Sequence, residues 1–233
     1  MSLSVVADPF GEYDAALLQQ SFTDRMILFK QHFVVDLSAP TDRLTCQNHL
    51  RNARKASRAL YVERCNRPLD LAADWTRLYS ILIDRHQIKG IGAFSRSAFL
   101  QQLNIPGIVV FRAVHGGSTV GMLLWYVMKH VAYYHLGAYD PVGYELRASF
   151  ALFLFAIQYF STTAARWLDL GGAAGVAASN AMDGLTRFKR GWSTGTRPAY
   201  FCGRILNPSL YEQLAKNMPA SDYFPIYRMG EFR

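Results

Sequence analysis

The sequence is organised around residues 131–192, which begin VAYYHLGAYDPVGYELRASFALFLFAIQYF (131–160), continue as STTAARWLDLGGAAG (161–175) and close with DGLTRFKRGW (183–192). This pattern predicts a strand, a long apolar helix, a buried strand, a glycine-rich loop and a short basic helix. Two strands joined in this way lie side by side and parallel, with the helix on one face. Because ligands bind beyond the carboxyl ends of such strands, we expect function near Gly137–Asp140 and Asp169–Gly172.

The flanking sequence adds antiparallel strands and amphipathic helices. Strands are predicted over residues 108–114 and 119–128, joined by a glycine turn, and over 131–138. Helices are predicted over 70–87, over 95–103 and from Gly143 onward. The fold class is therefore α/β or α+β, with a mixed, mostly antiparallel twisted sheet that contains one parallel strand pair and is flanked by helices. We expect residues 1–24 to be a loosely attached preface and residues 25–233 to form a single domain.

Composition restricts the partners and the compartment. The 233 residues carry a formal net charge of +8, which fits RNA, a nucleotide-bearing cofactor or an acidic membrane surface, or only a solvated basic surface. The three cysteines are far apart and predict neither a disulfide framework nor a metal pair, which favours the cytoplasm. The longest apolar run, residues 149–161, is shorter than the roughly 20 residues that span a bilayer, so no transmembrane segment is expected.

The motif LDLGG (168–172) followed by FKRGW (188–192) carries a family resemblance. Together with the order of elements, it resembles the GCN5-related N-acyltransferase (GNAT) superfamily, and within it the Fem-type (FemAB-like) branch, which includes the peptidoglycan-bridge aminoacyltransferases. The basic stretch HLRNARKASR (49–58) is similar to a helix of that branch. The resemblance covers roughly residues 25–206. It implies a GNAT-like fold and N-acyl transfer by direct attack of an amine in a ternary complex.

Four residues are candidates for the chemistry of acyl transfer. By resemblance, Lys189 lies at the transfer site, where a lysine can stabilise the developing oxyanion; the alternative is a surface cation. The attacking amine must lose a proton, so a proton-handling group is needed. Tyr134, His135 and Asp140 stand along or just after the first strand and are the candidates. A neutral histidine held in the sheet is the structural alternative for His135.

Further residues are expected to bind the substrate or the donor. Backbone N–H groups at the start of the helix from Gly143 could hold a phosphate, with Arg147 one turn into that helix. Asp169 either caps the following turn or orients the amine. Phe188 and Trp192 are either core residues or pocket walls. The set expected at the binding site comprises Phe188, Trp192, Gly143, Arg147, Asp169, Gly171, Gly172 and Arg190.

A stripe of four cations, Arg51, Arg54, Lys55 and Arg58, has the spacing that places residues on one helix face. It is either an RNA or phosphate site or a solvated face. No cluster has metal-ligand spacing.

The donor remains open between acyl-CoA or acetyl-CoA and aminoacyl-tRNA. GNAT enzymes that use acetyl-CoA usually carry Gln/Arg-x-x-Gly-x-Gly/Ala before the long helix, whereas Tyr139–Arg147 retains one glycine. The resemblance implies an amine-bearing small molecule or a cell-wall precursor as acceptor. The alternative function is a non-catalytic RNA- or nucleotide-binding protein that retains the fold. The sequence leaves the oligomeric state open.

Overall fold

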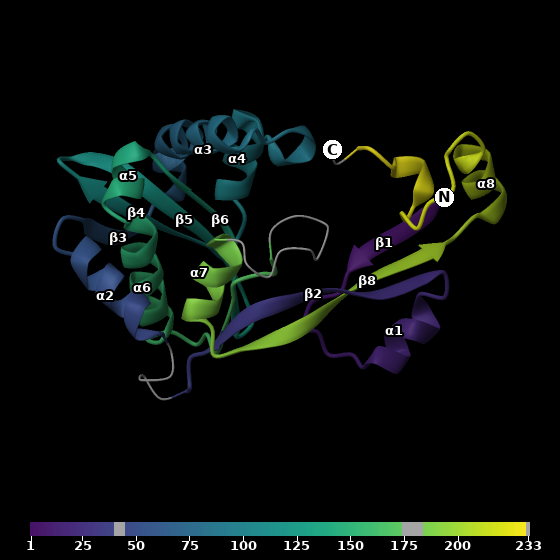
Figure 1. The fold of residues 1–233 in the computed structure, drawn as a ribbon, viewed down its shortest axis with the longest axis horizontal. Helices are drawn as coiled ribbons and strands as arrows, with labels where there is room; N and C mark the ends of the chain where they lie inside the picture. Colours follow the sequence, from purple (N-terminus) through teal and green to yellow (C-terminus); the bar gives the residue numbers. More distant parts are fainter. Residues whose placement is uncertain (40–44, 174–183, 232–233) are drawn as a thin grey trace. The chain divides into compact units, whose positions relative to one another are not determined.

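The computed structural model describes residues 1–39, 45–173 and 184–231 (Figure 1). The chain divides into two compact units, one formed by Met1–His32 with Arg197–Arg233 and the other by Phe33–Thr196. The chain passes between the units within strands β2 (Arg25–Asp36) and β8 (Gly195–Ile205). The expected boundary between residues 24 and 25 stays a prediction.

The larger unit contains a mixed sheet with β6 near its centre. Its strands lie in the order β2-β7-β6-β5-β4-β3. The bounds are Trp167–Asp169 for β7, Val131–Tyr139 for β6, Ser118–Met128 for β5, Ile108–His115 for β4 and Tyr61–Cys65 for β3. Strand β7 pairs antiparallel with β2 and parallel with β6, while β6, β5, β4 and β3 are antiparallel in turn. The predicted mixed, mostly antiparallel sheet with one parallel pair is confirmed.

Helices cover both faces of this sheet, as Figure 1 shows. Alternate residues along β4 and β5 enter two different cores, because successive side chains of a strand point to opposite faces. One core lies under α2 (Gln47–Ala56), α6 (Ala148–Phe160) and α7 (Gly184–Trp192) and contains Phe111, Leu123 and Trp125. The other lies under α3 (Ala72–His86) and α4 (Arg96–Leu103) and contains Val110 and Leu124.

The smaller unit pairs the two ends of the chain. Strand β1 (Ser2–Val6) lies antiparallel to β8, with Ser2 opposite Ile205, and β8 neighbours β2. Helices α1 (Ala15–Ser21) and α8 (Pro208–Ala215) are capped by the side chains of Asp14 and Asn207. The sequence pattern did not predict β1, because its pairing partner lies about 200 residues away.

The helix after β6 differs from the prediction. A five-residue helix, α5 (Pro141–Glu145), is followed by Leu146 and Arg147 before α6 begins at Ala148. Arg147 has a φ of 59° and ψ of 42°, a left-handed conformation that interrupts the helix. The expected continuous helix from Gly143 is therefore wrong, and Arg147 stands between two helices rather than one turn into one.

Candidate active site

Strand β7 is shorter than β6, so the second half of β6 has no paired neighbour on that side among the described residues. The parallel pairing with β7 ends with Asp169 opposite Tyr133, whereas β6 continues to Tyr139. No strand among the described residues pairs with β6 on that side beyond Tyr133. Residues 133–137 are partly exposed, although they lie in a central strand, while the flanking Ala132 and Ala138 are buried. Residues 134–137 are therefore partly exposed beyond the part of β6 that pairs with β7.

A β-bulge at His135 lies just beyond the part of β6 that pairs with β7. Leu124 of β5 faces Leu136, but its neighbour Trp125 faces Tyr134, so His135 is the extra residue of β6. The bulge shifts the alternation of side chains. Tyr134 packs on the α6 side, and Leu136 packs with the α3 and α4 core. In an unbroken strand Tyr134 and Leu136 would share one face, but the inserted residue places them on opposite faces.

His135 itself is a half-buried, neutral imidazole. Its Nε2 lies 3.4 Å from Oε1 of Gln102 in α4, and its ring centroid lies 5.0 Å from that of Tyr126. Burial lowers the pKa of His135 below the ordinary value of 6.5, because the charged form loses hydration. With the Gln102 amide assigned so that its oxygen faces the ring, Nε2 is the donor of this contact and Nδ1 is the candidate proton acceptor. The geometry suits a general base at neutral pH.

Tyr134 stays protonated at neutral pH. Its ring packs against Trp125 and Phe153, with centroid distances of 5.3 and 5.1 Å. Burial raises the pKa of the phenol well above 10, because phenolate would lose its hydration. Of the proton-handling roles expected for Tyr134, proton donation fits this environment and proton acceptance does not.

Asp140 is the N-cap of α5. Its Oδ1 accepts the backbone N–H of Gly143 at 2.8 Å, and its Oδ2 lies 3.5 Å from Nη1 of Arg77. A Cβ on Gly143 would lie 2.1 Å from the carbonyl oxygen of Val120, so the close approach of two backbones explains this glycine. The N–H that a phosphate would use is thus taken by a carboxylate, and a five-residue helix adds little dipole. We therefore do not place a phosphate at Gly143 or Arg147.

Two variants separate the capping role of Asp140 from the effect of its negative charge. Asp140→Ala is expected to lower the free energy of unfolding by about 1 kcal/mol, whereas Asp140→Asn, which can still cap, should lose less. Urea titration of both variants measures the difference. Equal stability of Asp140→Ala and the parent protein would contradict the capping role.

Lys189 holds the glycine loop after β7. Its side chain is 7% exposed, and its Nζ donates to the carbonyl oxygen of Gly172 at 2.7 Å. The backbone N–H of Gly171, which has a φ of 73°, donates to Oδ1 of the buried Asp169 at 2.7 Å. The structure thus brings together Lys189, Asp169, Gly171 and Gly172 at the carboxyl end of β7. Asp169 has the role of the turn cap, and Lys189 is not a surface cation.

The rest of the FKRGW motif packs around a histidine that the sequence analysis missed. His49 of α2 is buried, and its Nε2 lies 3.0 Å from the carbonyl oxygen of Phe188. Its ring centroid lies 5.5 Å from that of Phe188 and 5.1 Å from that of Trp192. A Cβ on Gly191 would lie 2.3 Å from the His49 ring. Phe188 and Trp192 are therefore core residues, while Arg190 is exposed.

A sequence signal for His49 did exist. His49, Ala53 and Ala56 have the spacing i, i+4 and i+7 of a buried helix stripe, and all three are buried. They lie on the side of α2 that faces α6 and α7. The four cations of the same helix lie on the opposite face.

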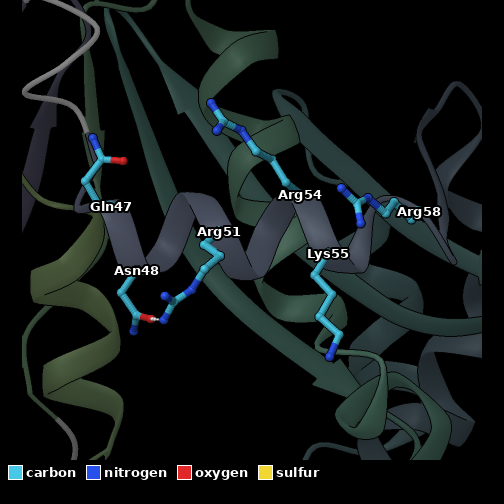
Figure 2. A pocket seen from close by; sticks show the side chains of 6 residues that line it. All are labelled: Gln47, Asn48, Arg51, Arg54, Lys55 and Arg58. Atoms are coloured by element: carbon cyan, nitrogen blue, oxygen red, sulfur yellow. Dashed lines mark hydrogen bonds between the residues drawn. The ribbon is translucent and has the colours of Figure 1, made fainter.

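That opposite face carries the predicted cation stripe. Figure 2 shows the side chains that line a surface hollow on this face, namely Gln47, Asn48, Arg51, Arg54, Lys55 and Arg58. The hollow has a volume of about 650 Å³. Arg51 donates to the side-chain oxygen of Asn48 at 2.9 Å. In the described part of the chain, no carboxylate forms a salt bridge with any of the four cations. The predicted grouping on one helix face is observed, and its positive charge is not paired with any carboxylate of residues 1–39, 45–173 or 184–231.

The described residues offer neither a metal-ligand cluster nor a membrane-spanning helix. Residues 1–39, 45–173 and 184–231 contain no group of three or more His, Cys, Asp or Glu side chains that could hold a metal ion. Within the same ranges, every helix is too short or too polar to cross a bilayer.

A sequence family described as "Acetyltransferase (GNAT) domain" matches residues 45–190. The chain belongs to this GNAT family. Membership makes the matched region, which contains β6 and α2, an acyltransferase domain. None of the curated proteins that were compared matches significantly.

Solved structures with the GNAT fold include proteins of the Fem type. FemX is 14% identical with a TM-score of 0.62, over 78% of this chain and 63% of its own. The C-terminal domain of a protein named as a lysylphosphatidylglycerol synthetase from Agrobacterium fabrum is 15% identical with a TM-score of 0.61, over 78% and 62%. L-PGS from Bacillus licheniformis is 18% identical with a TM-score of 0.60, over 84% and 67%. The chain spans less than two thirds of the first two structures, and these likenesses concern the fold.

Proposed function

We propose that this GNAT domain transfers an acyl or aminoacyl group from a phosphate-bearing carrier to an amine by direct attack, without a covalent enzyme intermediate. The observation that carries the proposal is the bulged His135, a neutral imidazole on the part of β6 that extends beyond its pairing with β7. The likeness to FemX and L-PGS supports the Fem-type branch as a model for the reaction.

In this mechanism His135 is the proton acceptor. Its Nδ1 takes the proton of the attacking amine, while Nε2 remains bonded to Gln102. The amine nitrogen bonds to the acyl carbon, and the bond from that carbon to the carrier oxygen or sulfur breaks. Lys189 and Asp169 hold Gly171 and Gly172 at the end of β7. Lys189 thus acts on the loop rather than through a free ammonium group.

The carrier is either CoA or tRNA. The residues after β6 do not offer CoA the anion site that a helix N-terminus provides, because Asp140 occupies it. Either carrier would need other cations, and the α2 stripe offers four of them. We therefore place no pyrophosphate at the N-terminus of α5.

The test is a transfer assay with a panel of donors. Acetyl-CoA, longer acyl-CoAs and charged tRNA would each be mixed with amine acceptors, including cell-wall precursors. The expected result is sequential kinetics with one donor class, and no acyl-enzyme after rapid quenching without acceptor. A trapped acyl-enzyme, or no transfer from any donor, would contradict the proposal.

A second candidate function is non-catalytic RNA or nucleotide binding. The four cations of α2 favour it, because phosphate contacts by Lys and Arg supply most of the non-specific affinity for nucleic acids. A tRNA-dependent transferase would also use this face, so binding alone does not separate the two functions. Transfer activity separates them.

Charge reversal on α2 tests this face. Arg54→Glu/Lys55→Glu should weaken binding of a fluorescent single-stranded RNA more than tenfold and reduce the slope of log K against log salt by about 1.4, since each lost contact removes about 0.7. Lys89→Glu/Arg96→Glu, which reverses two exposed cations elsewhere, is the matched control. Anisotropy titrations at several salt concentrations give both numbers. Equal losses in the two variants would mean that only the net charge matters.

A further inference from the structure

Two tyrosine hydroxyl groups converge over Gly137 in β6. A Cβ added to Gly137 would lie 2.5 Å from the hydroxyl oxygen of Tyr134 and 3.1 Å from that of Tyr139. The first distance is too short for a Cβ contact and the second is tight, so glycine lets the two hydroxyl groups approach this part of the strand without displacement. Gly137 is partly exposed and lies beyond the point where β7 leaves β6.

Each of the two hydroxyl groups can donate a hydrogen bond, but neither has an acceptor among the described residues. In the ranges 1–39, 45–173 and 184–231, neither the Tyr134 nor the Tyr139 hydroxyl has a hydrogen-bond partner, although Tyr139 is only 9% exposed. The indole N–H of Trp125, whose ring contacts Tyr134, is also buried without a partner in these ranges. Buried polar groups are nearly always hydrogen-bonded, so the buried N–H of Trp125 requires an explanation, and the two hydroxyl groups beside it are available to donate to a ligand.

The protonation state of the pair fits hydrogen-bond donation. Burial raises the pKa of both phenols well above the ordinary value of 10, so both keep their protons at neutral pH. The two rings are fixed by packing, Tyr134 against Phe153 and Tyr139 against Tyr144, with centroid distances of 5.1 and 5.5 Å. Fixed neutral donors in a partly dry site are what a developing oxyanion requires.

We propose that the hydroxyl groups of Tyr134 and Tyr139 donate to the carbonyl oxygen of the acyl group during transfer. This inference rests on the proposed acyltransferase function and assigns its oxyanion site. The amine nitrogen attacks the acyl carbon, and the π electrons move to the carbonyl oxygen, which the two phenols hold without losing their protons. When the carbonyl re-forms, the carbon–oxygen or carbon–sulfur bond to the carrier breaks, and the carrier leaves with the electron pair. The proton of the amine passes to His135.

The base and the two hydrogen-bond donors lie on different faces of β6, beside its unpaired edge. Tyr134 and Gly137 present their side-chain positions to the α6 side, while His135 lies beside Tyr126 and Gln102 on the α4 side. An acyl group at this edge could therefore be held from one face while the amine approaches from the other. The bulge is what places the base and the donors on different faces of one strand.

The test compares turnover with stability in Tyr134→Phe, Tyr139→Phe and the double variant. Phenylalanine keeps the ring and removes only the hydroxyl group. Loss of one oxyanion donor is expected to lower kcat about 100-fold, and the double variant should lose more. Because neither hydroxyl group has a partner among the residues that the structure describes, the melting temperature should stay unchanged or rise. Tyr79→Phe is the control, since its hydroxyl donates to the carbonyl oxygen of Gly92 at 2.9 Å. It should lose stability and keep turnover.

The outcomes separate the oxyanion-site inference from the proposed acyltransferase function. Slower transfer with unchanged or higher melting temperature supports the oxyanion site. Unchanged transfer in the double variant, with an active parent protein, overturns this inference and leaves the proposed function intact. A fall in melting temperature like that of Tyr79→Phe also overturns it, because the hydroxyl groups would then have structural partners. An inactive parent protein would instead refute the proposed function, and the inference with it.

Discussion

Replacing His135 by glutamine is expected to lower the rate of acyl transfer by about 100- to 10,000-fold, with a smaller change in KM. Glutamine can still contact Gln102, so the fold should be kept, but it cannot accept the proton of the amine. Steady-state kinetics with the active donor measure the effect. His115→Gln, which replaces an exposed histidine at the end of β4, is the matched control and should retain full activity.

The same residue sets the acidic limit of the parent enzyme. Transfer needs the neutral imidazole, and burial lowers the pKa of His135 below 6.5. Activity should therefore persist as the pH falls through 6.5 and decline only as the pH passes through the lowered pKa. The acidic limb should disappear in His135→Gln. An unchanged rate in that variant, or an acidic limb that survives in it, would assign the base to another group.

Gly191→Ala is expected to destabilise the larger unit by about 3 kcal/mol, the upper part of the range for overpacking. The new methyl group would lie 2.3–2.7 Å from three atoms of the His49 ring. That ring is enclosed by Phe150, Phe188 and Trp192 and cannot move away without breaking its hydrogen bond to the Phe188 carbonyl. Helices α2 and α7 would have to separate, so the loss should be large.

A second glycine of the same helix provides the control for this prediction. Gly184, at the start of α7, has open space around its Cβ position, and Gly184→Ala should leave stability unchanged or raise it slightly. Urea unfolding of both variants gives the comparison. If Gly191→Ala were as stable as Gly184→Ala, the close approach of His49 to α7 would be wrong.

The element order and the family resemblance were accessible from local patterns. The alternation of 131–138, the apolar run before residue 161 and the LDLGG motif predict a parallel pair with a crossover helix, and this pair is present. The spacing of Arg51, Arg54, Lys55 and Arg58 likewise predicts one helix face, which is observed. These features depend on neighbours within a few residues in the sequence, so the sequence alone determines them.

The candidate site depended on contacts that no local pattern contains. The bulge at His135 exists because β5 pairs with β6 out of step by one residue, and that step decides which side chains share a face. The meeting of Tyr134, Gly137 and Tyr139 also follows from this register. His49 meets FKRGW only because helices about 140 residues apart pack together. The sequence by itself therefore determined the strand–helix–strand unit, the cation stripe and the family. Only the tertiary structure decided the placement of base and donors, because strand register and helix packing arise from long-range partners.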